Sequence, residues 1–462
     1  MLFNTLLFLV FFLIVTITYY LLPHRFRWVW LLAASCYFYM YFKPAYILII
    51  FFTIIVDYCA GILIQNSTGA TRKLYLILSL VTNIGVLAFY KYFNFLVGNL
   101  NFLASAVHAP QIPLLNIILP LGLSFHTFQA MSYTIEVYRG NQKCEKHLGI
   151  YSLYVMFYPQ MVAGPIERPQ HILPQLHRVN KFISKNLVTG LFLMAIGLFK
   201  KVVIADRLGL FVDPVFANPH SHTAFDLLLA TYFFAFQIYC DFSGYSDMAI
   251  GAALVLGIHL MQNFNMPYLS KNIAEFWKRW HISLSTWFRD YLYIPLGGNR
   301  VSFSITCLNL LIVFAISGLW HGASWKYLAW GGIHGCLIVG YHLLKKFRLT
   351  IKGLTYFNWL ITFNMVCLAW IFFRADNVMD GWYIFKKIFT TLRFTYSSNS
   401  IMTSKEAWYC IIIIIGLMMG EWRLRNSSEF TKRKKIIITC GLGIICYFLG
   451  IFNETQFIYF QF

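Results

Sequence analysis

The sequence predicts an all-α protein that crosses a membrane many times, and two observations carry this prediction. First, the chain is 59% hydrophobic, 19% aromatic and only 12% charged, whereas a soluble domain carries about 25% charged residues. A soluble protein of 462 residues needs a water-facing surface that this composition cannot supply. Second, apolar runs recur along the chain at about the 20-residue length that a helix needs to cross the hydrocarbon core. We therefore expect an integral membrane protein.

The apolar runs give the expected helices in order. The best candidates are 2–22, 45–64, 74–97, 112–134, 186–205, 226–257, 303–320, 326–344, 357–373, 408–420 and 435–452, with 28–42 and 148–163 as weaker ones. Several are short or interrupted by glycine and polar residues, which is tolerated where the backbone is buried in protein or lines a cavity. We expect about 11 spans with re-entrant or in-plane pieces, and one membrane domain over 1–462, because no repeat or long linker is visible.

The first run lacks a basic n-region and a small-residue cleavage site, so we expect a retained helix rather than a signal peptide. Ten cysteines are present without a C-x-x-C pair. Most of them, such as Cys36, Cys240, Cys307 and Cys446, lie in apolar runs. Buried reduced thiols are expected, and no disulfide framework.

The distribution of the basic residues indicates how the chain is oriented in the membrane and argues against a nucleic-acid partner. The net charge is +20, yet no basic tail, zinc pattern or RNA-binding signature accompanies it. The lysines and arginines gather instead in loops between apolar runs, as the positive-inside rule expects. The segments expected in the cytoplasm are Arg139–Lys185, Lys271–Arg300 and Arg423–Lys435, joined by His24–Arg27 and Thr71–Lys73. The loop 98–111 has no charged residue and fits the outer side.

The segment 270–300 concentrates polar and charged residues, which are costly near lipid. Within it, 272–292 predicts one amphipathic helix. Its apolar stripe consists of Ile273, Phe276, Trp277, Trp280, Leu284, Trp287, Phe288 and Tyr291, and charged residues occupy the other face. This pattern is typical of a helix that lies in the membrane interface. A simple interfacial anchor is the alternative interpretation.

Three histidines are candidate functional residues. His321 closes the apolar run Leu308–Trp320 and falls within the bilayer by span length. Loss of hydration there favours the neutral imidazole that a general base requires. The small neighbours Gly318, Gly322 and Ala323 would let a substrate approach. The alternative is a histidine that only forms a hydrogen bond between helices.

His281 lies at the edge of the aromatic stripe, and His334 forms a second His-Gly pair. The three histidines match no zinc signature and have no acidic or cysteine ligand nearby in sequence, so no metal is expected. The chain also lacks the Gly-x-Ser-x-Gly elbow of a serine hydrolase.

Asp241 and Asp247 stand six residues apart in an apolar context. They would serve as ion or proton sites in a secondary transporter. Alternatively they brace a broken helix, which the turn-forming Ser243, Gly244 and Ser246 between them favour. Transporters of this kind usually show inverted repeats, and none is visible here.

Taken together, these motifs resemble the membrane-bound O-acyltransferase family, most closely its bacterial alginate O-acetyltransferase branch. The residues that carry the resemblance are Asp241–Gly251, Asn263–Tyr268, Phe276–Trp287, Arg289–Arg300, Gly318–Gly322, Val162–Arg168, the opening Phe3-Asn4 run and the final Phe457–Phe462. The resemblance covers nearly the whole chain.

The resemblance implies a ring of tilted helices around a tunnel, a catalytic histidine at His321 and a second functional histidine at His281. It implies an O-acetyltransferase in the bacterial inner membrane, with no bound cofactor. The donor would be cytoplasmic acetyl-CoA, and the acetyl would pass across the membrane to an exported polysaccharide such as alginate, directly or through a periplasmic partner protein. Asp241, Asp247, Trp320 and His334 would then brace the tunnel.

The acceptor stays open, because the branch serves alginate, cellulose, peptidoglycan and other glycans. D-alanyl-transferring relatives lack the patterns Pro-Leu-Gly-Gly-Asn-Arg and Phe-Ile-Tyr-Phe-Gln-Phe that this chain carries, which favours acetyl. Cationic side chains attract coenzyme phosphates. The candidates are Lys278, Arg279, Arg289 and Arg300, and ordinary positive-inside charge is the alternative for all four. A secondary transporter and a scaffold that recruits periplasmic partners are the competing classes.

Overall fold

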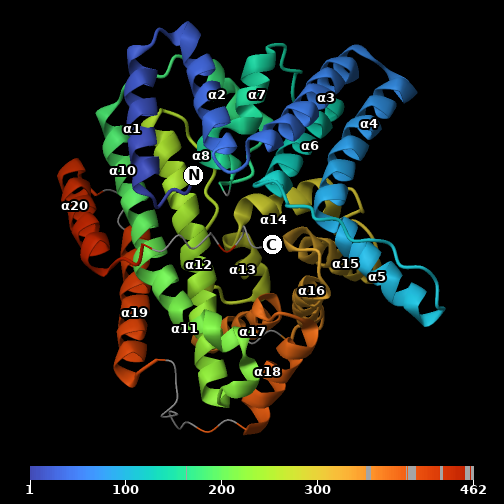
Figure 1. The fold of residues 1–462 in the computed structure, drawn as a ribbon, viewed down its shortest axis with the longest axis vertical. Coiled ribbons are helices and arrows are strands. Elements are labelled where there is room, and N and C mark those ends of the chain that lie inside the picture. Colours follow the sequence, from blue (N-terminus) through green and yellow to red (C-terminus); the bar gives the residue numbers. More distant parts are fainter. Residues whose placement is uncertain are drawn as a thin grey trace. The chain divides into compact units, whose positions relative to one another are not determined.

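Helices are the only regular elements among the residues that the computed structural model describes, which are 1–162, 164–349, 355–391, 393, 402–426, 430–452 and 458. The chain divides into two compact units, one formed by Met1–Met194 and Met248–Met261, the other by Ala195–Asp247 and Gln262–Phe462. Figure 1 labels the helices of both. The single-domain expectation stays a prediction.

The first unit contains short and long helices in succession along the chain. They are α1 (Leu6–Leu21), α2 (His24–Met40), η1 (Pro44–Tyr46), α3 (Ile47–Asn66), α4 (Gly69–Leu87), η2 (Ala88–Tyr92), α5 (Phe93–Ala106), α6 (Leu123–Arg139), α7 (Leu148–Met156), α8 (Tyr158–Met161), α9 (Pro169–His177) and most of α10 (Ser184–Leu198). Helices α3, α4 and α6 pack against one another, and α2 packs on α7.

A buried carboxylate ties α3 to α4. Asp57 is fully buried and accepts hydrogen bonds from Ser79 Oγ at 2.6 Å and from Asn83 Nδ2 at 2.8 and 2.9 Å. A buried polar group is costly unless it is hydrogen-bonded. The three residues therefore fix how two apolar helices face each other.

The second unit holds the histidines. Its helices are η3 (Phe199–Ala205), α11 (Asp206–Ala217), η4 (Pro219–Ser221), most of α12 (Ala224–Val255), η5 (Pro267–Leu269), α13 (Ile273–Arg279), α14 (Ile282–Phe288), η6 (Arg289–Tyr293), α15 (Phe303–His321), α16 (Trp325–Lys346), α17 (Thr355–Arg374), α18 (Val378–Thr391), α19 (Ser404–Asn426) and α20 (Lys432–Leu449). The π-helix η3 joins α10 to α11 without a break.

Six described helices are long and apolar enough to cross a membrane, which supports a multi-pass protein. They are Pro44–Asn66, Gly69–Ala106, Ser184–Ala217, Ala224–Val255, Phe303–His321 and Thr355–Arg374, and Leu6–Leu21 is a shorter apolar helix. The count of about 11 spans stays a prediction.

Some expected elements differ from the structure. The span expected at 112–134 begins only at Leu123, and Pro113 and Pro120 lie in the non-helical stretch before it. Proline removes a backbone donor and clashes with the preceding turn, which explains the late start. Helices α9 and α18 were not expected, because each is short. All ten cysteines are free thiols; Cys240 and Cys446 are buried, but Cys36 and Cys307 are partly exposed.

Candidate active site

The amphipathic segment is two short helices rather than the single helix that its periodicity predicts. Helix α13 ends at Arg279, and α14 begins at Ile282. Between them His281 adopts a left-handed backbone with φ of 43°. A residue other than glycine rarely adopts this conformation, and it persists only when surrounding contacts impose it.

The apolar stripe of this segment packs inside the second unit instead of lying open in an interface. Trp280 is fully buried, and Leu284, Trp287 and Phe288 are all at most 5% exposed. The break at His281 turns the two short helices so that the stripe faces protein. These side chains therefore contact protein, and the location of the segment at a membrane interface stays a prediction.

Asn263 holds the turn at His281. Its backbone carbonyl accepts the Ile282 N–H at 2.9 Å. Its side-chain Oδ1 lies 3.1 Å from His281 Nδ1 and accepts the Ser283 hydroxyl at 2.9 Å. Because that oxygen already accepts from Ser283, His281 Nδ1 must be the donor in the third contact. The imidazole is thereby fixed in the tautomer whose Nε2 carries the lone pair.

His281 is fully buried. Burial disfavours the imidazolium ion and lowers the pKa of His281 to about 3. The ring is therefore neutral near pH 7. A neutral ring with its lone pair on Nε2 is able to accept a hydrogen bond or a proton.

Trp320 brings the two principal histidines together. Its indole centroid lies 5.0 Å from the imidazole of His321 and 6.0 Å from that of His281. His321 is the last residue of α15, is 3% exposed, and also packs edge-on against Trp330 at 5.1 Å. The structure thus places His281, Trp320 and His321 in one aromatic cluster, which the sequence analysis did not predict.

The small residues beside His321 serve helix packing. A Cβ on Gly318 would lie 2.2 Å from the Tyr327 carbonyl oxygen, and one on Gly322 would lie 2.0 Å from the Tyr327 ring. Small residues let two membrane helices approach closely. Tyr327 of α16 fills the space beside Gly318 and the Cβ side of Gly322. That these small residues let a substrate approach stays a prediction.

A polar cavity adjoins the chain directly after His321. It has a volume of about 500 Å³, and its wall includes Gly322, Ala323 and Ser324. The other lining residues are mostly charged or polar, including Lys201, Asp206, Asp213, Gln237, Asp241, Lys326, Tyr327, Arg374 and Asp376. A hydroxylated substrate would find hydrogen-bond partners here.

Asp241 and Asp247 are ion-paired to two consecutive lysines on η3. Lys201 Nζ lies 2.7 Å from Asp241 and 2.8 Å from Asp206, and Lys200 Nζ lies 2.8 Å from Asp247 and 2.6 Å from Glu421. Each lysine is 5% exposed. Sequence reasoning missed Lys200 and Lys201, although two charges inside an apolar run are themselves a signal.

The helix that carries the two aspartates is unbroken, contrary to the prediction. Helix α12 runs continuously from Ala224 to Val255. Gly244 allows a close crossing rather than a turn, because a Cβ there would lie 2.6 Å from the Gly197 carbonyl oxygen. The aspartates brace the unit through ion pairs across helices.

We expect the lysine at the centre of each cluster to matter more to stability than one of its carboxylates. Lys200→Met leaves two carboxylates in a buried site without a cation, which should cost about 3–5 kcal/mol. Asp247→Asn leaves Lys200 paired to Glu421 and should cost clearly less. Thermal unfolding of both variants in the same detergent checks this order, and an equal loss in both variants would contradict it.

His334 lies in an aromatic enclosure of its own. It is fully buried on α16, and its ring contacts Phe276, Trp277 and Trp330 at centroid distances of 6.2, 5.0 and 4.9 Å. It contributes to packing around Trp330, which it shares with His321. Within the described part of the chain, no group of three or more His, Cys, Asp or Glu side chains is placed to hold a metal ion.

The four basic residues expected to attract phosphates differ in their surroundings. Arg279 is paired with Glu275, and Arg289 with Asp290 at 2.7 Å. Lys278 and Arg300 are exposed. None of the four lines the polar cavity that follows His321.

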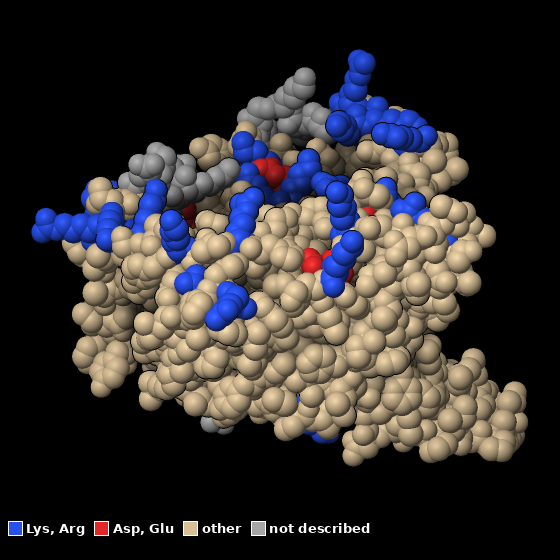
Figure 2. All heavy atoms as spheres, turned by 90° about the horizontal axis from the view of Figure 1, so that it is seen from above, with Lys and Arg blue, Asp and Glu red and all other residues tan. Residues whose placement is uncertain are grey.

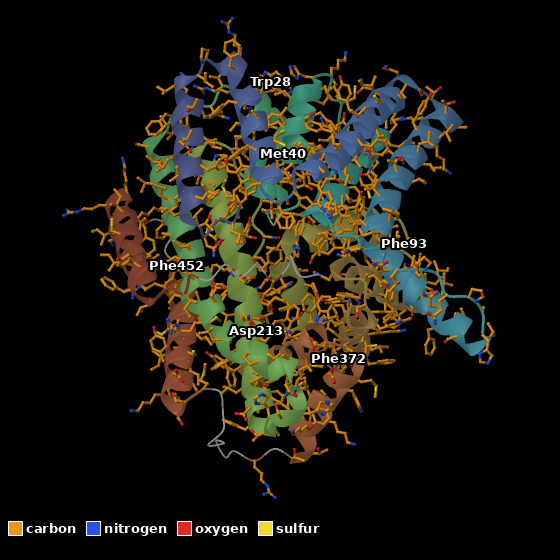
Figure 3. The ribbon with its side chains drawn as sticks, viewed as in Figure 1. Trp28, Met40, Phe93, Asp213, Phe372 and Phe452 are labelled. Carbon is orange, nitrogen blue, oxygen red and sulfur yellow. The ribbon has the colours of Figure 1, made fainter. Side chains whose placement is uncertain are left out.

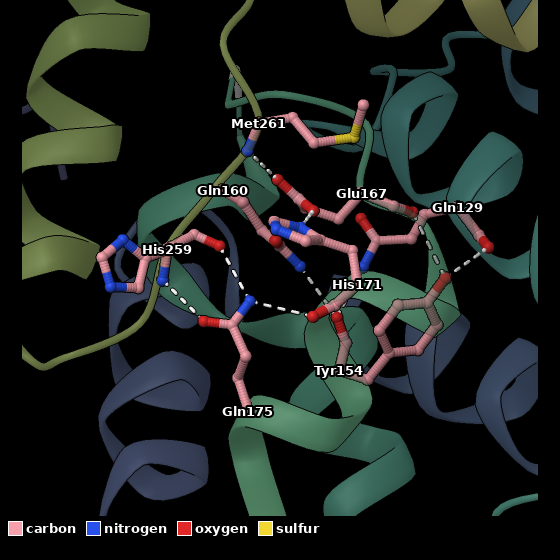
Figure 4. Close-up of polar contacts among 8 residues, drawn as sticks. All are labelled: Gln129, Tyr154, Gln160, Glu167, His171, Gln175, His259 and Met261. Atoms are coloured by element: carbon pink, nitrogen blue, oxygen red, sulfur yellow. Dashed lines mark hydrogen bonds and ion pairs between the residues drawn. The ribbon is translucent and has the colours of Figure 1, made fainter. Parts of the chain in front are cut away.

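In the first unit, the Val162–Arg168 segment supplies a buried clamp (Figure 4). Glu167 is fully buried; it accepts the Met261 N–H and pairs with His171 Nδ1 at 2.7 Å. Gln175 bonds both the N–H and the carbonyl of His259, at 2.8 and 3.0 Å. Burial raises the pKa of the Glu167 carboxyl. The clamp fixes the chain just after α12. Ala163 and, apart from Ile458, the Phe457–Phe462 motif lie outside the described residues.

The apolar helices define a multi-pass membrane protein, and its second unit contains a buried cluster of histidine and tryptophan side chains. The model of the membrane-bound O-acyltransferase family, MBOAT, matches residues 147–379, which include both His281 and His321. The chain belongs to this family and is an O-acyltransferase.

Relatives extend the match over most of the chain. A peptidoglycan O-acetyltransferase from Helicobacter pylori is 38% identical over 94% of this chain and 91% of its own length. The probable alginate O-acetylase AlgI of Pseudomonas aeruginosa is 39% identical over 90% of this chain and 81% of its own. A teichoic acid D-alanyltransferase from Bacillus subtilis is 29% identical over 58% of this chain and 71% of its own.

Proposed function

We propose that this protein transfers acetyl from acetyl-CoA to a hydroxyl group of a polysaccharide outside the cytoplasm, directly or through a partner protein. The single observation that carries the proposal is a buried His321 whose next three residues line a polar cavity of about 500 Å³, in a chain of the O-acyltransferase family. Two relatives that match 90% or more of this chain are named for acetylation of peptidoglycan and of alginate, both polysaccharides.

Helix α15 is long enough to connect the cytoplasmic side, where the donor is expected, with the outer side, where the acceptor is expected. It begins just after the basic segment Lys271–Arg300 and has 19 residues. At 1.5 Å per residue it is about 28 Å long, close to the roughly 30 Å of a hydrocarbon core. With the basic segment in the cytoplasm, the His321 end of α15 lies toward the outer leaflet. The polar cavity beside it is then on the acceptor side.

The chemistry assigned to His321 is general base catalysis. Its neutral imidazole takes the proton from the acceptor hydroxyl while the hydroxyl oxygen attacks the thioester carbonyl. The new C–O bond forms, the C–S bond breaks, and the departing thiolate receives the proton. His281, held by Asn263, would position the donor by accepting, at Nε2, a hydrogen bond from an amide N–H of the coenzyme's pantetheine arm. Lys278 and Arg300 are exposed and would attract the coenzyme phosphates.

The test is acetyl transfer by the full chain in vesicles, with acetyl-CoA labelled in its acetyl group. Label should appear as an alkali-labile ester on added peptidoglycan or alginate, or on a hydroxyl of a co-purified protein. The acceptor that takes the label separates the two glycans. No transfer from acetyl-CoA, combined with transfer from a D-alanyl donor, would replace the proposal by D-alanyl transfer.

A further inference from the structure

A second cavity, in the first unit and apart from the histidine cluster, has no role in the acyl transfer described above. Its volume is about 240 Å³. We name it the arginine cavity; its lining consists of Tyr19, His24, Arg25, Arg27, Trp28, Leu31, His147, Ile150, Leu153, Leu176, His177, Arg178, Asn180 and Ile258. It is formed by the beginning of α2, the beginning of α7 and the end of α9 with the residues that follow it.

Apart from Tyr19, the ionisable side chains that line the arginine cavity are all basic. Three arginines and three histidines line it, and no aspartate or glutamate does. None of the three arginines forms an ion pair with a described carboxylate. The nearest acidic group in this network is Glu145, which bonds His177 Nε2 at 2.7 Å. An anion would therefore meet cations whose charge is not already neutralised.

One of these arginines is built firmly into the wall. Arg27 donates from Nε to the Leu22 carbonyl at 3.0 Å and from a terminal nitrogen to the Asn180 carbonyl at 2.6 Å. Its guanidinium also lies 5.0 Å from the ring centroid of Tyr19. A fixed cation of this kind costs little further ordering when a ligand binds. Arg25 and Arg178 are exposed and free to close on the ligand.

The beginning of α2 adds to the positive potential. Trp28 and Met40 mark the two ends of this helix in Figure 3, and the cavity lies at the Trp28 end. Pro23 at the N-cap makes no side-chain capping bond, and helix N-termini carry positive partial charge. His147 Nδ1 accepts the Ile150 N–H at 3.2 Å, so its Nε2 is the protonated nitrogen, available to donate.

The elements that form the arginine cavity also carry exposed apolar side chains. Leu21, Phe26, Leu148, Val179 and Phe182 are exposed by 44% or more. They belong to the same ends of α1, α2 and α7, and to the stretch after α9. Exposed apolar side chains next to cations are typical of the level where lipid tails meet headgroups. Figure 2 shows lysine and arginine side chains gathered on part of the face it views, with few carboxylates among them.

We propose that the arginine cavity binds the phosphate of an anionic membrane phospholipid, with the acyl chains lying along the apolar side chains around it. The lining segments, His24–Arg27 and Arg139–Lys185, are those that the positive-inside rule assigns to the cytoplasmic side. A pocket that takes a whole drug-sized ligand measures about 300–1,000 Å³. At about 240 Å³ the arginine cavity suits a headgroup rather than an entire coenzyme.

The test uses the full chain and leaves Arg27 unchanged, because its backbone contacts hold the fold. The double variant Arg25→Gln/Arg178→Gln removes two exposed cations of the lining. Lys143→Gln/Lys185→Gln is the matched control, since both lysines are exposed in the same basic segment but outside the lining. Native mass spectrometry measures retention of phosphatidylglycerol and of phosphatidylcholine by each form.

The unaltered chain should retain one phosphatidylglycerol in preference to phosphatidylcholine. Each cation near an anionic headgroup contributes about fivefold in affinity, so the double variant should bind phosphatidylglycerol about 25-fold more weakly. The lysine control should bind as the unaltered chain does. Equal retention of the two lipids, or unchanged binding by the double variant, overturns the proposal.

A competition experiment tests whether the arginine cavity binds a lipid phosphate or a soluble phosphate compound. Acetyl-CoA and inorganic phosphate are each added in competition with phosphatidylglycerol. Neither should displace the lipid at millimolar concentration. Displacement by acetyl-CoA, with a raised KM for acetyl-CoA in the double variant, would assign the arginine cavity to the donor and overturn the lipid assignment. Because lipid retention is measured without turnover, the result is independent of the proposed acetyl transfer.

Discussion

Replacing His321 by alanine is expected to abolish acetyl transfer. General base catalysis contributes about 10²- to 10⁴-fold to a rate. The ring is buried, and the three residues that follow it in the chain line the polar cavity. Turnover should fall by at least that factor at every donor concentration. The measurement is initial rate against acetyl-CoA concentration with labelled acetyl, for the purified variant in vesicles.

His334→Ala is the matched control for this substitution. His334 is another buried imidazole, and both rings pack against Trp330. Truncating either ring leaves a comparable void, so both variants should lose stability by a similar amount. Only His321→Ala should lose the reaction. Normal acetylation by His321→Ala, or equal inactivation of both variants, would remove His321 from the role of base.

The class of fold was predictable from the sequence because it depends on composition and local pattern, whereas the roles of His281 and His321 stay predictions. Apolar run length predicts spans directly, and helices occupy most of the expected ranges. The buried position of His321 follows from its place at the end of such a run. Its neighbours are a matter of tertiary packing, so the sequence alone could not show that Tyr327 fills the space beside Gly322.

Two predictions of local structure, a turn at Gly244 and a continuous helix at His281, were wrong because a contact with a residue distant in sequence decides the conformation at each position. At Gly244 the sequence suggests a turn, and the structure shows a helix crossing against Gly197. At His281 the period suggests a continuous helix, and the structure shows a left-handed break. Small residues serve turns and close crossings equally well, and a strained backbone depends on a partner distant in sequence. That partner, Asn263, lies 18 residues away from His281.

His281→Gln is expected to impair the use of acetyl-CoA while leaving turnover at saturating donor. His281 shares Trp320 with His321, and its Nδ1 donates to Asn263, which leaves Nε2 as an acceptor. In the proposed role, Nε2 accepts a hydrogen bond from an amide N–H of the coenzyme's pantetheine arm and so positions the donor. The loss of one positioning hydrogen bond should raise the KM for acetyl-CoA about tenfold. Steady-state kinetics over a wide donor range measures KM and kcat separately.

Asn263→Ala provides an independent check, because it leaves the imidazole in place and removes only its support. The side chain of Asn263 fixes the His281 tautomer and accepts from Ser283. This variant should therefore raise the KM in the same direction as His281→Gln. His321→Ala, in contrast, should not recover at any donor concentration. Suppose His281→Gln lost all turnover while calorimetry showed unchanged donor binding. A positioning role would then be untenable, and the two imidazoles around Trp320 would have to share the proton transfer.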